Sequence, residues 1–452
     1  MARSTRTPPL PWSGVSRLPG LEGRIPPSRR GAIVLTTLGS LGDLYPVLSI
    51  ARALEETGVE TRLALSPDDC EVARSWGLLS TPLGPSHAEA EIITGMSRDA
   101  IAAHVLRDMG PLLRDHMIPM LPDLMAPMLE LCHGAALVAG TAFALAGPLA
   151  AERAGLPYVP LALQPMLTFS PLDPPRARGF GAAISRPRIA PARAWNRGQI
   201  ALAHAVLRAR HRSGLNRVRA GIGLPQGQAT PLIAQDCDVP LRLGLWDAAF
   251  SPLPADRRDG WRLTGFPPAP EGHLPREVQT WLDAGPPPLV VTLGSIAQGI
   301  AGPRFWTEAV ALARALGLRA VLLHGRAEVP QGADLLALPH AAHAPLFPQA
   351  AAVLHHGGIG TTAEALRAAR PQLVVPIGGD QPDNAARVAR LGYGVVLPAR
   401  RFRADRAMPL VRGLLERFDY AGAVAFGHDI AAADGAREAA RLLAGLARTD
   451  RP

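Results

Sequence analysis

Residues 352–384 constrain the fold more than any other part of this chain, because strand, turn and helix signals follow one another there without a gap. The apolar run at 352–355 predicts a short strand, and the glycines behind it predict a tight turn. The composition from 361 to 369 favours a helix, and the apolar run at 373–377 predicts the next strand. Strands that alternate with helices in this way are typical of a parallel α/β sheet.

The glycine turn itself predicts a binding site for a diphosphate. Free backbone N–H groups at a helix start lie at the positive end of the helix dipole, where they attract anions. Gly358 and Gly360 let a ligand approach that backbone, and His356 can donate a hydrogen bond to a phosphate oxygen. The turn lacks the GxGxxG pattern of a dinucleotide loop. An alternative is purely structural, because Thr361 and Glu364 have the spacing of a capping box.

A polar loop with the sequence GGDQ ends the second of these strands. Asp380 and Gln381 offer both acceptors and donors for the adjacent hydroxyl groups of a sugar. Ligands of open α/β sheets lie beyond such strand ends, so the loop and the glycine turn together indicate a nucleotide-sugar site. The alternative is that Asp380 only caps the helix that Pro382 begins.

Two parts of the chain begin with an apolar strand, which predicts an α/β protein with two Rossmann-like domains that face a cleft. The first part opens with strands at 31–37 and 61–65 around a helix, and the second opens with a strand that ends in Gly294 and Ser295. The predicted organisation is a disordered extension at 1–30, an N-terminal domain at 31–250, a linker at 251–286 and a C-terminal domain at 287–445.

The turn after the first strand, LGSLGDLYP, contains a candidate catalytic carboxylate. Gly39, Ser40 and Gly42 form this turn around Asp43, and we expect them to form a loop that faces the acceptor. A hydroxyl group is a poor nucleophile while it holds its proton, and Asp43 stands where a general base would reach an acceptor in the cleft. The alternative is that Asp43 only stabilises the start of the following helix through the helix dipole.

These motifs, in this order, resemble family 1 glycosyltransferases of the GT-B fold, the UDP-glycosyltransferase superfamily, over most of residues 31–445. The resemblance implies inverting transfer of a hexose from a nucleoside diphosphate sugar, of the UDP-glucose or dTDP-rhamnose type, with no metal or other cofactor. It implies that Asp43 is the base and that Glu364 binds the ribose. The implied diphosphate residues are His356, Gly358, Gly360, Thr361, Gly294 and Ser295, and the implied sugar residues are Asp380 and Gln381.

The acceptor and the nucleotide base are less defined. Plant members stack a tryptophan on the base, whereas this chain has HAAHAPLFPQ at 340–349, with His343 as the candidate neighbour of a uracil or thymine. Residues 141–175 resemble bacterial glycolipid rhamnosyltransferases, and macrolide and sterol glucosyltransferases are similar too, which predicts a hydrophobic acceptor such as a lipid, sterol or polyketide-like product. Two alternatives stay open: an epimerase of the same fold, and a non-catalytic partner that binds nucleotide-sugars.

The amino-acid composition favours some classes of binding partner and one cellular compartment over others. All 47 basic residues are arginine, and the net charge of +9 favours anionic partners such as nucleotide-sugars and acidic membrane surfaces. Aromatic residues are scarce, so a platform for nucleic acid is not expected. Cys70, Cys132 and Cys237 stand apart, without the spacing of a disulfide framework or a metal site, which fits a reducing cytoplasm.

Two apolar stretches raise the question of membrane contact. Residues 134–151 carry no charge and are long enough to span, but Gly140 and Thr141 divide them into a predicted strand and a packed helix. The methionine-rich stretch at 109–131 would allow peripheral contact with the inner membrane face, or it is an ordinary helical core. Residues 1–30 lack the apolar core of a secretory signal.

Overall fold

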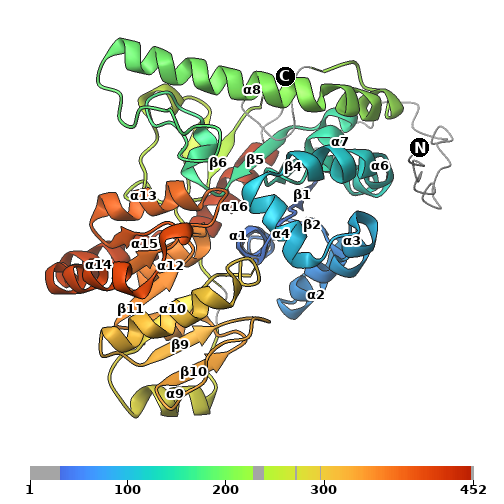
Figure 1. Ribbon diagram of the computed structural model, residues 1–452. Coiled ribbons are helices and arrows are strands. Elements are labelled where there is room, and N and C mark those ends of the chain that lie inside the picture. The colour runs from blue at the N-terminus through green and yellow to red at the C-terminus, as the bar shows by residue number, and fades with distance from the viewer. Residues whose placement is uncertain (1–30, 228–238, 270–271, 296, 449–452) are drawn as a thin grey trace, which may run out of the picture.

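A computed structural model of the chain describes residues 31–227, 239–269, 272–295 and 297–448. Within these residues the strands form two sheets in which every pair is parallel (Figure 1). The first sheet has the order β3-β2-β1-β4-β5-β6-β7 and the second has the order β10-β9-β8-β11-β12-β13. Each sheet reverses its strand order once, between β1 and β4 and between β8 and β11, and such switch points are where open α/β sheets bind ligands.

The first domain contains the strands β1 (Ala32–Thr36), β2 (Thr61–Leu65), β3 (Ser80–Pro82), β4 (Ala135–Gly140), β5 (Tyr158–Ala162), β6 (Arg242–Gly244) and β7 (Trp261–Leu263). Its helices are α1 (Leu41–Glu56), α2 (Pro67–Ser75), α3 (His87–Thr94), α4 (Arg98–Arg107), α5 (Gly110–Leu112), α6 (Ile118–Cys132), α7 (Ala146–Ala154) and α8 (Ala190–Gly221). A π-helical turn, Leu113–Met117, joins α5 to α6.

The second domain contains the strands β8 (Leu289–Thr292), β9 (Ala320–Leu323), β10 (Leu335–Leu338), β11 (Ala352–His355), β12 (Gln372–Val374) and β13 (Gly394–Val396). Its helices are α9 (Arg276–Asp283), α10 (Gly302–Ala315), α11 (His343–Leu346), α12 (Ile359–Arg367), α13 (Gln381–Leu391), α14 (Ala404–Arg417) and α15 (Tyr420–Ala432). The last helix, α16 (Gly435–Arg448), crosses back to the first domain.

Apolar side chains alternate between the two faces of each sheet, so each sheet is covered on both sides. In the first sheet, Ile33 and Leu35 pack with α1 and α16, whereas Val34 on the opposite face packs with α6, α7 and α8. In the second sheet, Val291 packs with α10 and α14, and Val290 packs on the other side with α9 and α11. Such two-sided burial is what parallel sheets require.

The structure confirms the predicted fold class and moves several boundaries. The strands at 61–65 and 352–355 lie where the sequence predicts them, and residues 134–151 divide into β4 and α7. No described helix combines the length and the hydropathy that a membrane span requires. The first sheet continues past the predicted boundary at residue 250, because β7 in the predicted linker pairs with β6. Helix α16, predicted in the C-terminal domain, buries Ala439 and Leu443 against α1 instead.

The methionine-rich stretch turns out to be helical core. Residues 110–132 form α5, the π-helical turn and α6 in sequence. Met125 and Met128 are fully buried and pack against the first sheet. The core interpretation of this stretch therefore fits the structure, and the same side chains are not available to a membrane.

Candidate functional site

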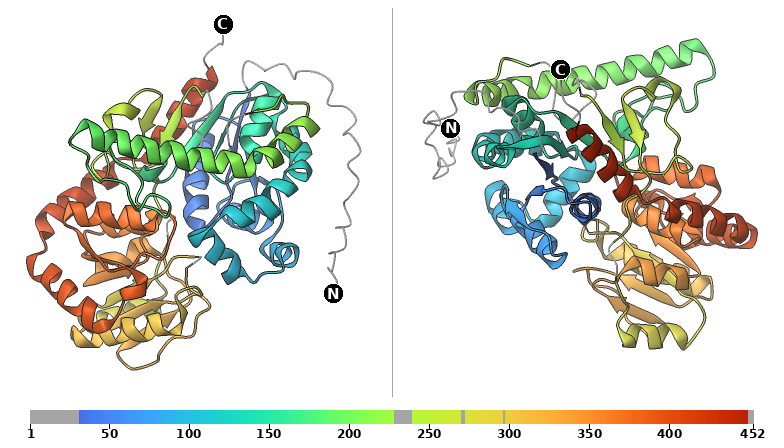
Figure 2. Two further views of the ribbon diagram at one scale, coloured as in Figure 1. Left: turned by 45° about the horizontal axis from the view of Figure 1, so that its top comes forward. Right: turned by 180° about the vertical axis from the view of Figure 1, so that it is seen from behind.

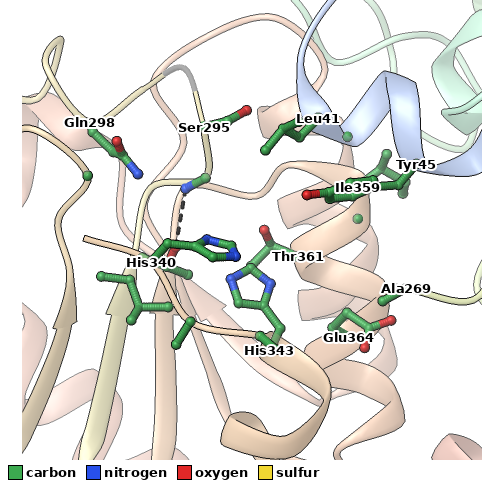
Figure 3. A pocket seen from close by; sticks show the side chains of 18 of the residues that line it. Leu41, Tyr45, Ala269, Ser295, Gln298, His340, His343, Ile359, Thr361 and Glu364 are labelled. Atoms are coloured by element: carbon green, nitrogen blue, oxygen red, sulfur yellow. Dashed lines mark hydrogen bonds between the residues drawn. The ribbon is translucent and has the colours of Figure 1, made fainter. Parts of the chain in front are cut away.

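A cavity of about 840 Å³ lies between the two domains. Leu41, Gly42 and Tyr45 of α1 form its wall on the first domain, together with the first turns of α4. The wall on the second domain comes from the loops that follow β8, β9 and β10, and from the start of α12 (Figure 3). Because these loops lie at the carboxyl ends of neighbouring parallel strands, the sheet itself brings their side chains together.

The glycine turn lies in this cavity. Gly358 is the N-cap of α12, so Thr361 lies inside the helix and the predicted capping box with Glu364 does not form. Gly360 and Thr361 line the cavity, together with Gly294 and Ser295 of the neighbouring loop after β8. A Cβ atom placed on Gly360 would meet nothing within 4 Å, so open space lies in front of this helix start. The free N–H groups of α12 therefore face the cavity as a diphosphate site requires.

His356 lies directly behind these glycines. Cβ atoms placed on Gly294 or on Gly358 would collide with its imidazole ring, and the distance from the Gly294 Cβ to His356 Cε1 would be 2.7 Å. Burial lowers the pKa of His356 to about 3, so the ring is neutral and has one N–H. Its buried Nδ1 has no hydrogen-bond partner within the described chain. A buried ring nitrogen that no protein group satisfies is costly, and it is free to bind a ligand.

The neighbouring histidine has a structural role. His355 is fully buried in β11, and its Nδ1 accepts a hydrogen bond from the Gly357 N–H at 3.1 Å. Its Nε2 pairs with Gln372 Oε1 of β12 at 2.9 Å. Both nitrogens are therefore used within the sheet, which separates this histidine from His356.

Glu364 is buried and lines the cavity one helical turn beyond Thr361. Its Oε1 accepts a hydrogen bond from Arg367 Nη1, and Arg367 Nη2 donates to the carbonyl oxygens of Phe266 and Pro267 at 2.8 and 3.0 Å. Arg367 thus fixes both the carboxylate and the chain segment that joins the domains. No sequence motif distinguishes Arg367 from the other arginines.

Two histidines line the part of the cavity formed by the loop after β10. The rings of His340 and His343 point into the same space (Figure 3), and His343 stacks on Phe347 with a centroid distance of 4.4 Å. Burial, with smaller contributions from His340 and His355, lowers the pKa of His343 to about 3. His343 was expected near the nucleotide base, and His340 is an additional candidate that the sequence pattern did not separate from it.

Asp380 and Gln381 begin α13 but do not cap it. Asp380 occupies the N-cap position without a capping hydrogen bond, so the predicted alternative role is not observed. Asn384 Nδ2 donates to Asp380 Oδ2 at 2.7 Å and to the Gly357 carbonyl oxygen at 3.0 Å, which joins this loop to the glycine turn. The buried Gln381 uses Oε1 to accept from Ile377 N–H at 2.8 Å. Neither Asp380 nor Gln381 lines the 840 Å³ cavity itself.

Asp43 stabilises the start of α1, as one of the two interpretations of this residue predicts. Its Oδ2 accepts from the backbone N–H and from Oγ of Ser40, each at 2.8 Å, and Ser40 Oγ accepts from Gly42 N–H, so a capping box is present. A side chain at Gly39 would collide with this carboxylate. Burial nevertheless raises the pKa of Asp43 above its usual value, although the bonds from Ser40 act in the opposite direction.

Asp43 belongs to the first domain and Asp380 to the second, and the two domains contact each other near Asp380. Burial raises the pKa of Asp380 to about 7, and the charge of Asp43 across the cleft contributes to the rise. Nearby, the Gly379 N–H donates to the Leu106 carbonyl oxygen of α4 at 2.8 Å, which joins the first domain to the GGDQ loop. The loop that carries Asp380 therefore lies against the first domain.

Arg387 forms a buried network of ion pairs on the helix that begins at Asp380 and Gln381. Arg387 of α13, 2% exposed, donates from Nε to Asp383 Oδ2 and from Nη1 to Asp173 Oδ2, both at 2.7 Å. Its Nη1 also contacts Ser251 Oγ. Asp173 belongs to the long loop before α8, so Arg387 connects this loop with the helix that begins at Asp380 and Gln381.

Comparison with known proteins agrees with this geometry. Residues 321–445 match the family model "Erythromycin biosynthesis protein CIII-like, C-terminal domain". The vancomycin aglycone glucosyltransferase of Amycolatopsis orientalis is 31% identical over 426 residues, which are 93% of this chain and 98% of that protein. The O-mycaminosyltylonolide 6-deoxyallosyltransferase of Streptomyces fradiae is 36% identical over 207 residues, 44% of this chain and 46% of that protein.

Solved structures show the same fold. Spinosyn rhamnosyltransferase SpnG, complexed with thymidine diphosphate, superposes with a TM-score of 0.62 at 19% identity, covering 91% of this chain and 100% of that one. The similarity to the vancomycin enzyme extends over nearly the whole length of both proteins. The chain therefore belongs to the family 1 glycosyltransferases of the GT-B fold.

Proposed function

We propose that the protein transfers a hexose, with inversion, from a nucleoside diphosphate sugar to a hydroxyl group of a hydrophobic acceptor. Asp43 would remove the hydroxyl proton, and the oxygen would attack the anomeric carbon as its bond to the diphosphate oxygen breaks. Charge then develops on the leaving diphosphate. The His356 N–H, Thr361, Ser295 and the helix start at Gly358 and Gly360 would stabilise that charge.

The observation that carries the proposal is that the loop of Asp380 lies against the first domain, where the Gly379 N–H donates to the Leu106 carbonyl oxygen at 2.8 Å. The contribution of the Asp43 charge to the raised pKa of Asp380 supports a proposed base near a proposed sugar ligand. Oδ2 of Asp43 is used by Ser40, so Oδ1 is the atom that would accept the proton. Glu364, with Oε1 used by Arg367, would offer Oε2 to the ribose. The proposal assigns no step to a metal ion or another cofactor.

The names of two relatives support the choice of acceptor. These relatives are named for the natural products vancomycin aglycone and O-mycaminosyltylonolide. We propose an acceptor of that kind, and a donor with either uridine or thymidine diphosphate. Both proteins are named as transferases, so they lend no support to the epimerase alternative.

A panel of nucleotide-sugars tests the donor. A ligand that binds the folded state raises the melting temperature, and we expect one UDP- or dTDP-hexose to raise it more than the others. The best donor is then incubated with lipophilic hydroxylated aglycones and, separately, with free sugars, and products are identified by mass spectrometry. Products with free sugars alone would contradict the hydrophobic acceptor, and turnover of the donor without any acceptor would favour the epimerase.

A further inference from the structure

Large apolar side chains that face solvent collect on one segment of the first domain. Of the 11 exposed large apolar side chains among the described residues, five lie between 184 and 206. They are Ile184 (43% exposed), Ile189 (63%), Trp195 (54%), Leu202 (65%) and Val206 (39%). Scattered exposed apolar residues are normal, whereas a contiguous group on one element marks an interaction surface.

This group belongs mainly to α8, which is 32 residues long and lies on the outside of the molecule (Figures 1 and 2). One side of α8 packs inward through residues such as Asn196, Ile200 and His204. On the opposite side, the exposed residues between 194 and 209 carry no charge except for Arg197, which lies at the border of this side. We call it the outer face of α8, and its larger members and their small neighbours are Trp195, Gly198, Ala201, Leu202, Ala205 and Val206.

Arginine surrounds the outer face. The helix contains seven arginines and no acidic residue, and the sequence from 174 to 227 has no Asp or Glu at all. Arg193 and Arg197 at one end, and Arg210, Arg212 and Arg217 at the other, are exposed. Glu152 pairs with Arg219 near the C-terminal end of α8 and does not reach the outer face. The surface thus combines an apolar centre with a cationic border.

We propose that the outer face of α8 docks the protein on the surface of an anionic phospholipid membrane. An apolar face with tryptophan and leucine, bordered by arginine, is the composition of helices that lie in the membrane interface. Guanidinium groups pair with lipid phosphates in bidentate geometry, and their apolar stems can extend along the buried face. The inference does not rest on the proposed reaction. It also replaces the methionine-rich stretch at 109–131, where Met125 and Met128 are buried in the core, as the surface for membrane contact.

A second copy of the chain fits this face less well. The apolar part runs from 194 to 209, so an antiparallel copy centred on it would place Arg193 beside Arg210 of the other copy. A parallel copy would place each arginine beside its own equivalent. Both arrangements bring like charges together, with no acidic residue on α8 to compensate.

Sedimentation with lipid vesicles tests the proposal on the full chain. We expect binding to vesicles that contain phosphatidylglycerol, little binding to pure phosphatidylcholine, and a decrease with added salt. Leu202→Glu should weaken binding at least about tenfold, because it places a charge where an apolar side chain would be buried. Arg193→Gln and Arg197→Gln should each weaken it about fivefold. Leu79→Glu is the matched control, since Leu79 is 88% exposed and lies elsewhere.

Melting curves of each variant establish that it is folded before binding is compared. Absence of binding to anionic vesicles by the wild-type protein would overturn the proposal, and so would equal binding by Leu202→Glu. Light scattering after gel filtration measures the oligomeric state of the wild-type protein and of the variant. A wild-type dimer that Leu202→Glu converts to a monomer would assign the outer face to a second copy and overturn the lipid assignment.

Discussion

The charge of Asp43 in the first domain raises the pKa of Asp380 in the second, although the two residues are far apart in the sequence. Burial is the larger cause and brings the pKa of Asp380 to about 7. Asp43 in turn has a raised pKa from its own burial. Two carboxyl groups from different domains thus have raised pKa values, as carboxyl groups at sites that use acid and base chemistry often do.

This relationship predicts how Asp380→Asn changes stability with pH. Because the pKa is higher in the folded chain than in the unfolded one, the wild-type protein loses stability as the pH rises from about 4 to about 7. Asparagine can still accept the bond from Asn384 but never ionises. We expect the variant to be more stable than the wild type at pH 8, by roughly 2 kcal/mol, and to gain much less at pH 5. Urea unfolding at both pH values measures this, and an equal gain at both would refute it.

The substitution Gly360→Ala should lower the affinity for the donor without lowering the stability of the fold. Alanine favours a helix over glycine by roughly 0.5–1 kcal/mol, and the position has no neighbour within 4 Å, so the variant should be as stable as the wild type or more. Its methyl group would occupy the space where the diphosphate is proposed to lie, so nucleotide-sugar affinity should fall at least about tenfold. Gly445→Ala in α16 has the same open surroundings and is the control for calorimetric titration. Unchanged affinity in Gly360→Ala would move the diphosphate away from this helix start.

We expect His356 to contribute to binding and catalysis as a neutral imidazole whose protonation state does not change. Its pKa of about 3 keeps the imidazole neutral throughout the working range of pH. Binding of a nucleotide-sugar, whose diphosphate does not titrate between pH 5.5 and 8, should therefore show no step from this residue. His356→Ala should lower kcat by about 10²–10³, as loss of one donor to a developing anion does elsewhere. A binding step near pH 6.5 that disappears in this variant would show that the ring is charged.

Arg387 should be required for stability rather than for affinity. Arg387→Met leaves Asp383, 1% exposed, without its partner in the interior, which typically costs about 3–5 kcal/mol. Arg304→Met removes an exposed arginine from the pair with Glu308 and should cost less than about 1 kcal/mol. Denaturant unfolding of both variants measures the difference. Equal stabilities would mean that the network around Arg387 is solvated.

Local sequence patterns were sufficient for the elements that face the cleft. The strand at 352–355 and the turn around Gly358 and Gly360 depend on residues close in sequence, so spacing and composition determined them. The same local patterns predicted capping roles for Thr361 and Asp380 that the structure does not show, because several residues near a helix start can have the spacing of a cap. Helix α12 begins at Ile359, before Thr361, and Asp43, which we propose as the base, also takes part in the capping box of α1.

Contacts between segments that are far apart in the sequence could not be predicted from local patterns. Arg387 with Asp173, Asn384 with Gly357, and α16 on α1 all join parts of the chain that no local pattern relates. Arg98 and Asp99 of α4 line the cavity from the first domain and carried no motif at all. The roles of these residues follow from topology, which places strand ends and helix starts from both domains around one cavity.

Transfer by Asp43→Asn tests the central claim most directly. Asparagine keeps an acceptor for both bonds from Ser40, so the start of α1 should stay intact, but it cannot take a proton. With the best donor and acceptor, we expect kcat to fall at least about 10²-fold while donor affinity and melting temperature stay close to wild type. Asp123→Asn, at an exposed aspartate of α6, is the control. Transfer by Asp43→Asn at the wild-type rate would show that Asp43 only caps its helix and would contradict the mechanism.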